Sequence, residues 1–265
     1  LARWAVQAAL RRRLAALPRL GLVGDAPLPR EVDEDLRALG FTVLEGYGST
    51  EQVVSCVRRR DGNTPGTIGE PLPQVELRVV DRGLREVGPG EVGQLAVAGP
   101  NVCLGYHADE VRDAASFAVI DGRRFLLSGD LGWRDRGGRL VFVGRVVNVL
   151  RAAAGPVYPE LTENALRNSP CIEQAMLYAR RPEGTGVLVA VDPRHIPAAA
   201  DPVEYLRGEI RATLAAAGLD ARQIPTHFIV AARPFRVGDE LTVTLKLRRE
   251  ATYSSLCAAA REHSL

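Results

Sequence analysis

The chain has 265 residues, of which 46% are hydrophobic and 25% are charged, the proportions of an ordinary soluble globular protein. Its 34 basic and 32 acidic residues leave a net charge of +2, which excludes a strong field for nucleic acid or acidic lipid. The densest basic run, Arg58–Arg60, precedes Asp61 and is predicted to lie on a solvated surface. Widely spaced cysteines and histidines exclude zinc-site spacing and favour reduced, mostly buried thiols in the cytoplasm. No apolar run reaches the length of a membrane span.

The first 51 residues alternate between helix and strand. We predict two helices and two short apolar strands, over residues 2–17 and 29–39 and over residues 20–23 and 41–44 respectively. Pro18 ends the first helix and Pro29 lies near the start of the second. A strand, a loop, a helix and a strand in this order are typical of an α/β domain with parallel strands.

The segment 52–143 has a different character, with short strands separated by Gly, Pro and Asp turns. Strands are predicted over residues 75–80, 94–98, 125–128 and 140–143. Gly137 and Gly138 mark a hairpin turn before the last of these strands. The pattern predicts an antiparallel sheet or barrel packed on the first segment.

The remaining segment is predicted to form a small α+β domain. Its helices are expected over residues 159–168, 202–217 and from about 250, and its strands over 173–179, 186–191 and 227–232. We therefore expect three parts: residues 1–143, made of an α/β segment 1–51 and a β-rich segment 52–143, then a hinge over 144–150 and a mobile domain over 151–265.

The run Gly46–Glu51 follows a predicted buried strand and is the first candidate for chemistry. Its glycines allow the backbone to approach a ligand closely, and ligands of α/β sheets bind beyond the carboxyl ends of strands. Tyr47 offers a flat face for a purine, Thr50 a hydroxyl for phosphate, and Glu51 an oxygen ligand for magnesium. A plain glycine-rich turn is about as consistent with the residues alone.

Two further candidates lie downstream. Asp130, in Ser128-Gly129-Asp130 between a predicted strand and the hairpin, can accept both hydroxyls of a ribose, or simply cap a turn. Arg145, in the predicted hinge, can hold a phosphate or ribose, or bridge two domains.

Lys246 is the only lysine among the 34 basic residues. Lysine is a compact ammonium on a flexible stem, whereas arginine is a broad planar fork, so a lone lysine suggests a point charge delivered through a narrow opening. The alternative is that one lysine falls there without any special role.

Taken in order, six segments resemble the acyl-adenylate-forming superfamily of acyl-CoA synthetases, fatty-acyl-AMP ligases, luciferases and peptide-synthetase adenylation domains. They are Gly24–Leu28, Gly46–Glu51, Gly66–Pro73, Gly93 through Gly105-Tyr106, Ser128–Gly132 and Leu241–Arg249. The last is similar to the lysine motif of the long-chain fatty-acyl branch.

The resemblance implies a reaction in which a carboxylic acid, here fatty-acid-like, reacts with ATP and Mg²⁺ to give an acyl-AMP. A thiol of coenzyme A or of a carrier protein's phosphopantetheine then accepts the acyl group after the small domain rotates. It implies Lys246 as the catalytic residue and Glu51 as the metal ligand. The implied cofactor-binding residues are Gly24, Ala26, Glu45, Gly46, Tyr47, Gly48, Thr50, Glu51, Asp130 and Arg145.

Three departures from the family pattern accompany this resemblance. No segment matches the family's Ser/Thr/Gly-rich phosphate loop, so the chain is expected to be the C-terminal half of a member, as Leu1 also suggests, with the other half truncated or supplied by a separate chain. At the hinge, Val147 and the alanine-rich loop 151–156 replace the usual residues, although Val157–Pro159 and Glu163 still match. Asp25 replaces a glycine near the acyl pocket and either recognises a polar substrate or points to solvent. These departures keep open a non-catalytic, degenerate module that binds an adenylate or a partner protein.

Overall fold

The computed structural model describes residues 2–14, 17–24, 28–180, 184–257 and 260–265. The chain divides into two compact units, residues 1–147 (unit 1) and residues 148–265 (unit 2). Asp25 and Ala26, which carry two of the predicted roles, lie outside the described residues. Among the described helices, none combines the length and the apolar character that crossing a bilayer demands.

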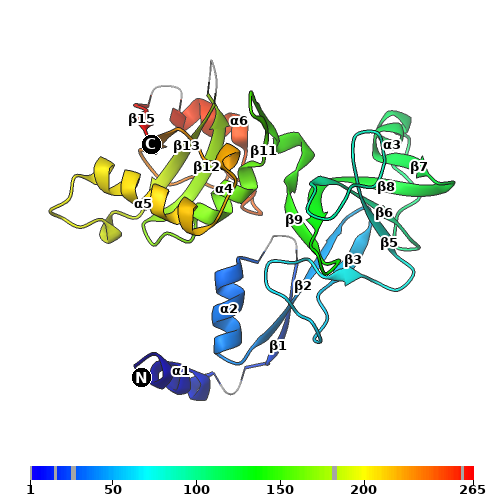
Figure 1. Cartoon of the computed structure of the whole chain (residues 1–265), viewed down its shortest axis with the longest axis horizontal. Coiled ribbons are helices and arrows are strands. Elements are labelled where there is room, and N and C mark those ends of the chain that lie inside the picture. The colour runs from blue at the N-terminus through cyan, green and yellow to red at the C-terminus, as the bar shows by residue number, and fades with distance from the viewer. Residues whose placement is uncertain (1, 15–16, 25–27, 181–183, 258–259) are drawn as a thin grey trace. The chain divides into compact units, whose positions relative to one another are not determined.

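Unit 1 begins with an α/β layer (Figure 1). Helix α1 (Ala2–Arg13) precedes β1 (Leu20–Val23), α2 (Arg30–Ala38), β2 (Thr42–Ser49), β3 (Val53–Val57) and β4 (Glu70–Pro71). The strands form a sheet in the order β1-β2-β3-β4, in which β1 and β2 are parallel and the other pairs are antiparallel. A parallel pair needs a crossover, and α2 provides it, as the sequence predicts.

The second layer of unit 1 is an antiparallel sheet of β5 (Glu76–Val80), β6 (Gly93–Ala98), β7 (Phe117–Ile120), β8 (Arg123–Arg134) and β9 (Leu140–Arg145). Its order is β5-β6-β8-β7, with β9 pairing β8, and α3 (Glu110–Ser116) precedes β7. The inward residues Leu77, Leu95 and Leu140 pack against Tyr47 of the first sheet in one buried cluster. The predicted fold class, an α/β segment followed by an antiparallel sheet, is confirmed.

Several predicted boundaries are wrong. The first helix ends at Arg13 rather than residue 17, ahead of Pro18. Strand β2 continues to Ser49, beyond the predicted end at residue 44 and through the glycines of the first motif, because it pairs with β3 as a hairpin. Strand β8 likewise runs from Arg123 to Arg134 and includes Ser128-Gly129-Asp130. Residues Gly46–Ser49 of the first motif and the whole of the second therefore belong to strands, while Thr50 and Glu51 lie in the turn after β2.

Unit 2 is built on a mixed sheet. Its elements are the 3₁₀ turn η1 (Val146–Asn148, which begins in unit 1), β10 (Leu150–Ala152), β11 (Gly155–Val157), α4 (Pro159–Leu166), β12 (Ile172–Ala179), β13 (Thr185–Val191), η2 (Pro193–His195), α5 (Pro202–Ala216), η3 (Ala221–Gln223), β14 (His227–Val230), α6 (Arg249–Thr252), the π-turn η4 (Tyr253–Cys257) and β15 (His263–Ser264). The sheet order is β12-β13-β14-β15, and β10 and β11 form a separate hairpin.

Both faces of the unit 2 sheet are covered (Figure 1). Ala175 and Leu177 of β12 belong to the core cluster that contains buried residues of α4 and α5. Met176 and Tyr178 point to the opposite face and join the cluster of Phe235, Leu241 and Cys257. This alternation follows the two-residue period of a strand. Leu241 and Leu247, on either side of Lys246, pack on the face away from the core of α4 and α5.

Candidate functional site

Asp130 is the point at which three predicted site residues meet. The Tyr47 phenol donates a hydrogen bond of 2.8 Å to Oδ2, and Nε of Arg145 lies 3.2 Å from Oδ1. The pairing of β8 with β9 sets Asp130 opposite Arg145, while Tyr47 reaches across from β2 of the other sheet. The Asp130 side chain is 7% exposed and that of Arg145 is 55% exposed, so a fixed carboxylate lies beside an accessible guanidinium.

The Tyr47 ring is packed into unit 1. It is 7% exposed and belongs to the cluster with Cys56 and Ile68. Burial and the neighbouring charge of Asp130 raise the pKa of the Tyr47 phenol, so the hydroxyl stays protonated and remains a donor. Because little of the ring is open to a ligand, stacking on adenine stays a prediction.

Glu51 lies in the turn between β2 and β3 and is held by two hydroxyl donors. Tyr106 donates to Oε1 and Ser49 donates to Oε2, each over 2.8 Å, and Nη2 of Arg112 lies 4.0 Å from Oε1. Burial raises the pKa of Glu51, but the hydrogen bonds from Tyr106 and Ser49 outweigh it, and the pKa lies below its ordinary value. Glu51 is therefore an anion at neutral pH.

The surroundings of Glu51 fit a magnesium ion that takes most of its ligands from elsewhere. The described residues contain no group of three or more His, Cys, Asp or Glu that could hold a metal. Magnesium is commonly bound by one or two carboxylates together with water and substrate phosphates. Each carboxylate oxygen has two lone-pair sites, so Glu51 can accept Tyr106 and Ser49 and still bind a cation. Thr50, beside it, is exposed and can offer its hydroxyl to a phosphate.

Glu45 is part of a buried ion cluster. Its Oε2 accepts 3.0 Å from Nη2 of Arg58, and Oε1 accepts 3.2 Å from the backbone N–H of Leu28. Arg58 also pairs with Asp33 of α2, and its side chain is 1% exposed. The predicted solvation of Arg58 is therefore wrong, because two buried carboxylates draw it inward, whereas Arg59 and Arg60 are exposed. The cofactor-binding role of Glu45 stays a prediction.

The glycines of the first motif differ in what they require. A Cβ at Gly48 would lie 1.6 Å from the Val53 carbonyl oxygen, so only glycine fits the hairpin there. A Cβ at Gly46 would meet nothing closer than 3.8 Å. A Cβ at Gly24 would lie 3.5 Å from the Gly46 carbonyl oxygen, which shows that these two predicted site glycines are neighbours.

Lys246 is the one predicted site residue in unit 2. It is exposed and ends a loop whose flanks, Leu241 and Leu247, form an isolated antiparallel bridge. The Lys246 N–H donates to Thr242 Oγ1 over 3.0 Å, and the Thr242 N–H donates to the Lys246 carbonyl over 2.9 Å. These two hydrogen bonds between Thr242 and Lys246 close the loop, and Lys246 lies exposed at its end.

The hinge residues that depart from the family pattern lie in an exposed turn and in a short hairpin. Val147 is 86% exposed and lies in the turn η1 (Val146–Asn148), directly after Arg145. The alanine-rich loop forms the hairpin of β10 and β11, with Gly155 at a φ of +122°. These residues make a chain of tight turns after β9.

The sequence did not predict two residues that hold Glu51 and its turn, Tyr106 and Asn101. Tyr106 lies in the Gly105-Tyr106 element of the resemblance but was given no role. Asn101 holds the Glu51 turn through its side-chain N–H groups, which contact the Gln52 carbonyl at 2.7 Å and Ser55 Oγ at 2.9 Å. A pattern signal existed only for Tyr106, which is part of the quoted Gly105-Tyr106 pair, whereas no motif residue marks Asn101.

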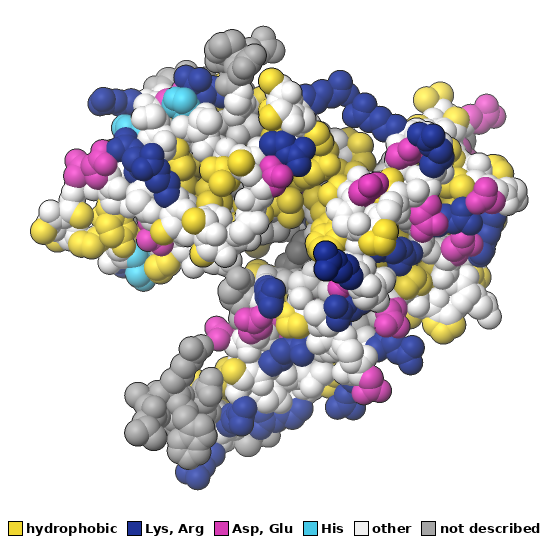
Figure 2. Space-filling view, viewed as in Figure 1, with side chains coloured by type: hydrophobic (Ala, Val, Ile, Leu, Met, Phe, Trp, Pro, Cys, Tyr) yellow, Lys and Arg dark blue, Asp and Glu magenta, His cyan; other side chains and the backbone are white. Residues whose placement is uncertain are grey.

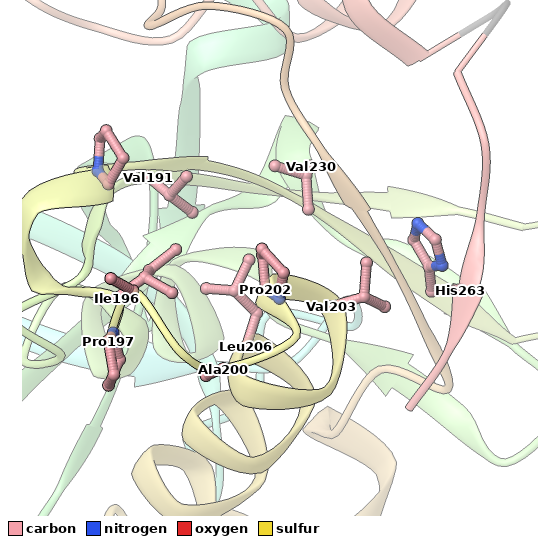
Figure 3. Close-up of a pocket in the computed structure, with 11 residues that line it drawn as sticks. Val191, Ile196, Pro197, Ala200, Pro202, Val203, Leu206, Val230 and His263 are labelled. Atoms are coloured by element: carbon pink, nitrogen blue, oxygen red, sulfur yellow. The ribbon is translucent and has the colours of Figure 1, made fainter.

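An apolar hollow in unit 2 is separate from these residues (Figure 3). It has a volume of about 450 Å³ and, apart from His263, an apolar lining: Val191, Pro193, Ile196, Pro197, Ala198, Ala200, Pro202, Val203, Leu206 and Val230. None of the predicted site residues lines it.

On the face shown in Figure 2, basic and acidic side chains are interspersed, in keeping with the small net charge.

Residues 2–107 match the model of a family described as AMP-binding enzyme. The chain is 33% identical over 195 residues to long chain acyl-CoA synthetase 6, peroxisomal, of Arabidopsis thaliana, a match that covers 69% of this chain and 27% of that protein. It is 29% identical over 186 residues to the long-chain-fatty-acid–[acyl-carrier-protein] ligase AEE15, chloroplastic, of the same plant, covering 65% of this chain and 25% of the relative.

Among solved structures, the chain resembles O-succinylbenzoate coenzyme A synthetase (MenE) from Bacillus subtilis in complex with ATP and magnesium ion. The TM-score is 0.73 at 26% identity, covering 93% of this chain and 49% of that one. The chain thus spans about a quarter of these two curated relatives and about half of the solved enzyme. The family match and the shared fold confirm the resemblance, and the chain belongs to the AMP-binding enzymes of the acyl-adenylate-forming superfamily.

Proposed function

We propose that this protein activates a carboxylic acid with ATP, releasing pyrophosphate and forming an acyl-AMP, and then transfers the acyl group to a thiol. The observation that carries the proposal is the meeting of Tyr47, Asp130 and Arg145 in a chain of the AMP-binding family. A buried, oriented carboxylate beside an exposed guanidinium suits a nucleotide, whose ribose donates hydrogen bonds and whose phosphate is anionic.

Within this proposal Asp130 accepts the ribose hydroxyls, and the Tyr47 phenol keeps its carboxylate aimed. Arg145 lies beside the same carboxylate and contacts ribose or phosphate. Glu51 is the ligand for Mg²⁺, whose chemistry when bound is to neutralise the phosphates, and Thr50 donates to a phosphate oxygen. Gly24, Ala26 and Gly46, with Gly48 in the hairpin, are proposed to let the backbone approach the nucleotide.

Lys246 is the proposed catalytic residue. In the reaction, a carboxylate oxygen bonds to the α-phosphorus while the bond from that phosphorus to the pyrophosphate oxygen breaks. Negative charge builds on the α-phosphate oxygens, and an ammonium beside them lowers the barrier. Because Lys246 belongs to unit 2, the proposal includes a hinge over residues 144–150 that brings the small domain to the site and then rotates it for thiol transfer.

The finer features are proposed from the relatives. One relative is named for a long-chain fatty acid and an acyl carrier protein, and the other for long-chain acyl-CoA, which supports a fatty-acid-like substrate. We propose coenzyme A or a phosphopantetheine thiol as acceptor and the cytoplasm as location. Phosphate-loop chemistry comes from a part of the protein outside this sequence or from a separate chain.

The Lys246→Ala variant of the complete protein tests this assignment. Carboxylate-dependent exchange of pyrophosphate into ATP is expected to fall by about 10²–10³-fold, as when one transition-state donor is removed. Arg211→Ala, which removes an exposed charge from α5, serves as the control and is expected to keep full exchange. Undiminished exchange in Lys246→Ala would remove the lysine from the mechanism.

The alternative function is a non-catalytic module that binds an adenylate or a partner protein. Val147 and the alanine-rich hairpin favour it, since both replace residues that the family uses around the hinge. Calorimetry of this chain with ATP, AMP and a non-hydrolysable acyl-adenylate analogue separates the two. Tight binding of the analogue supports the enzyme, whereas absence of any nucleotide binding supports the partner-binding module.

A further inference from the structure

The loop that carries Lys246 is exposed, but its two ends are anchored in the core of unit 2. Val243 is 86% exposed and Leu245 is 66% exposed, whereas Leu241 is 8% exposed. Leu245 also has a φ of +61°, a left-handed conformation that non-glycine residues rarely adopt. The exposed side chains of this loop contribute little packing energy, so the conformation of the loop depends on the contacts that hold its two ends.

The upstream end is held by Glu240, which is 1% exposed. Arg233 binds its carboxylate with both terminal nitrogens, over 2.8 and 2.9 Å. The Arg236 N–H donates 3.0 Å to Oε2, and Ser255 Oγ donates 2.8 Å to Oε1. Four donors on one carboxylate fix the residue in position and orientation, and the paired guanidinium adds directionality.

The downstream end is held by Arg249, three residues after the lysine. Its two terminal nitrogens donate to the two oxygens of Glu163 on α4, over 2.7 and 2.9 Å. Glu163 is 4% exposed and also accepts 2.7 Å from the Leu177 N–H of β12. The base is closed by a bond of 2.8 Å from the Arg248 N–H to the Glu240 carbonyl.

We propose that Glu240 and Glu163, with Arg233 and Arg249, are positioning residues that fix the base of the Lys246 loop and so define where its ammonium can reach. The inference rests on the proposed function, because it assigns these residues to the delivery of Lys246. None of the four touches the reacting atoms. The structural alternative is that the two ion pairs stabilise unit 2 without any bearing on the lysine.

The first experiment uses the uniqueness of Lys246 and needs no activity. A lysine-specific endoprotease can cut this chain after one residue only, at the Lys246–Leu247 bond, so its rate reports the opening of this loop. In Glu240→Gln and Glu163→Gln the cleavage rate is expected to rise by about tenfold or more, since proteolysis follows the population of the opened state. Glu250→Gln, an exposed carboxylate in the same segment, is the matched control and keeps the original rate.

The cleavage is followed by mass spectrometry at a temperature where circular dichroism shows every variant folded. Glu240→Asp is the second variant in case Glu240→Gln does not fold, since it keeps the charge and loses reach. Cleavage rates equal to that of the control in the folded Glu240 and Glu163 variants would overturn the proposal.

The second experiment measures pyrophosphate exchange in the complete protein. Glu240→Gln is expected to lower kcat by about tenfold with the KM for ATP and carboxylate unchanged, because only the charge delivered in the transition state is misplaced. In a Lys246→Ala background the same change is expected to cost nothing further, since contacting or coupled residues are not additive. An equal loss in both backgrounds marks a structural role and overturns the inference.

The two proposals fail in different ways. Full exchange in Lys246→Ala contradicts the role of the lysine while the protease result still reports the loop. Strong loss in Lys246→Ala with no effect of Glu240→Gln leaves the proposed function standing and removes the positioning residues alone.

Discussion

At the scale of single residues, the carboxylates of unit 1 differ in their hydrogen-bond partners and in how far they are buried. Asp130 accepts a buried hydrogen bond from the Tyr47 phenol and pairs with the exposed Arg145, and Glu51 accepts part-buried hydrogen bonds from Tyr106 and Ser49. Glu45 is instead enclosed with Arg58 and has a pKa that burial raises above its ordinary value. The first two are suited to ligands that come and go, whereas the third is suited to holding α2 against β2.

Tyr106→Phe is expected to change the pH dependence of the proposed adenylation. Burial raises the pKa of Glu51 and the Tyr106 hydrogen bond opposes it, so removal of the hydroxyl raises that pKa. Glu51 then takes up a proton at a higher pH and loses its hold on magnesium sooner on acidification. The acid limb of the magnesium-dependent rate therefore moves to higher pH, while the rate above pH 8 changes little.

The measurement is a pH profile of pyrophosphate exchange at limiting magnesium. Tyr253→Phe, a 43% exposed tyrosine of unit 2, provides the control. An acid limb that coincides with that of the parent protein would show that Tyr106 does not act through Glu51.

Arg58→Met is expected to destabilise unit 1 by about 3–5 kcal/mol at pH 7, because it leaves buried carboxylates without their partner. The loss of Arg58 also raises the pKa of Glu45 further, since its charge opposes the effect of burial. A folded-state pKa that is raised means stability lost as the pH rises, so the deficit shrinks as the pH falls toward 5. Urea unfolding at both pH values measures this difference.

Arg59→Met is the comparison, since the side chain of Arg59 is 75% exposed and its Nη1 lies 3.8 Å from Oε2 of Glu70. It is expected to change stability by less than about 0.5 kcal/mol. A similar loss in both variants, or a deficit that does not depend on pH, argues against the buried cluster.

The residue scale also shows what the sequence could and could not predict. Asp130, Tyr47 and Arg145 were identified through motifs, and the structure brings them together. The burial of Arg58 was not predicted, because its partners Asp33 and Glu45 lie on other elements and carry no local signal. Long-range ion pairs of this kind depend on tertiary packing rather than on the neighbouring sequence.

At the scale of elements, the first motif is a hairpin rather than a loop, and Gly48 allows it to close. The register pairs Gly48 with Val54 and Ser49 with Val53. Val53 has a φ of +49°, an unusual value for a β-branched residue, so the turn is already constrained. The Glu51 turn is therefore held at a defined place by the strands and by Asn101.

Gly48→Ala is expected to destabilise unit 1 by about 1–3 kcal/mol, the range for side-chain atoms added where there is no room. The added Cβ would lie 1.6 Å from the Val53 carbonyl oxygen and has to push the two strands apart. Gly21→Ala in β1 is the matched control, since its Cβ meets nothing within 4 Å. Thermal unfolding of both variants gives the comparison, and equal midpoints contradict the steric argument.

Element type was easier to predict than element length. The sequence pattern alone predicts strands in the apolar runs 20–23 and 41–44 and the α2 crossover between them. The extension of β2 through Gly46–Ser49 and of β8 through Gly129 was missed, because glycines and polar residues read as turns until a paired strand supplies their hydrogen bonds. The length of β2 and of β8 depends on the strands that pair with them, and the sequence of one strand does not show which strand will be its partner.

At the scale of the whole molecule, each unit has its own core. Leu95, Val97 and Leu140 lie in a cluster of unit 1, and Leu188, Ile210 and Phe228 lie in clusters of unit 2. The chain divides between Val147 and Asn148, within the turn η1 that follows Arg145. Separate cores joined by a short turn are what a mobile small domain requires, which supports the proposed hinge.

The two cores predict two unfolding transitions in calorimetry of this chain, rather than one cooperative transition. Variants in each unit assign them. Gly48→Ala is expected to lower only the transition of unit 1, and Glu240→Gln only that of unit 2. The pKa of Glu240 is lowered to about 2 by its hydrogen bonds with Arg233, so its contribution is present above its ordinary pKa and is lost as the pH falls from about 4.5 toward 2. The unit 2 transition of the parent protein should therefore fall toward that of Glu240→Gln over this range, and a single peak moved by both variants would show that the units unfold as one.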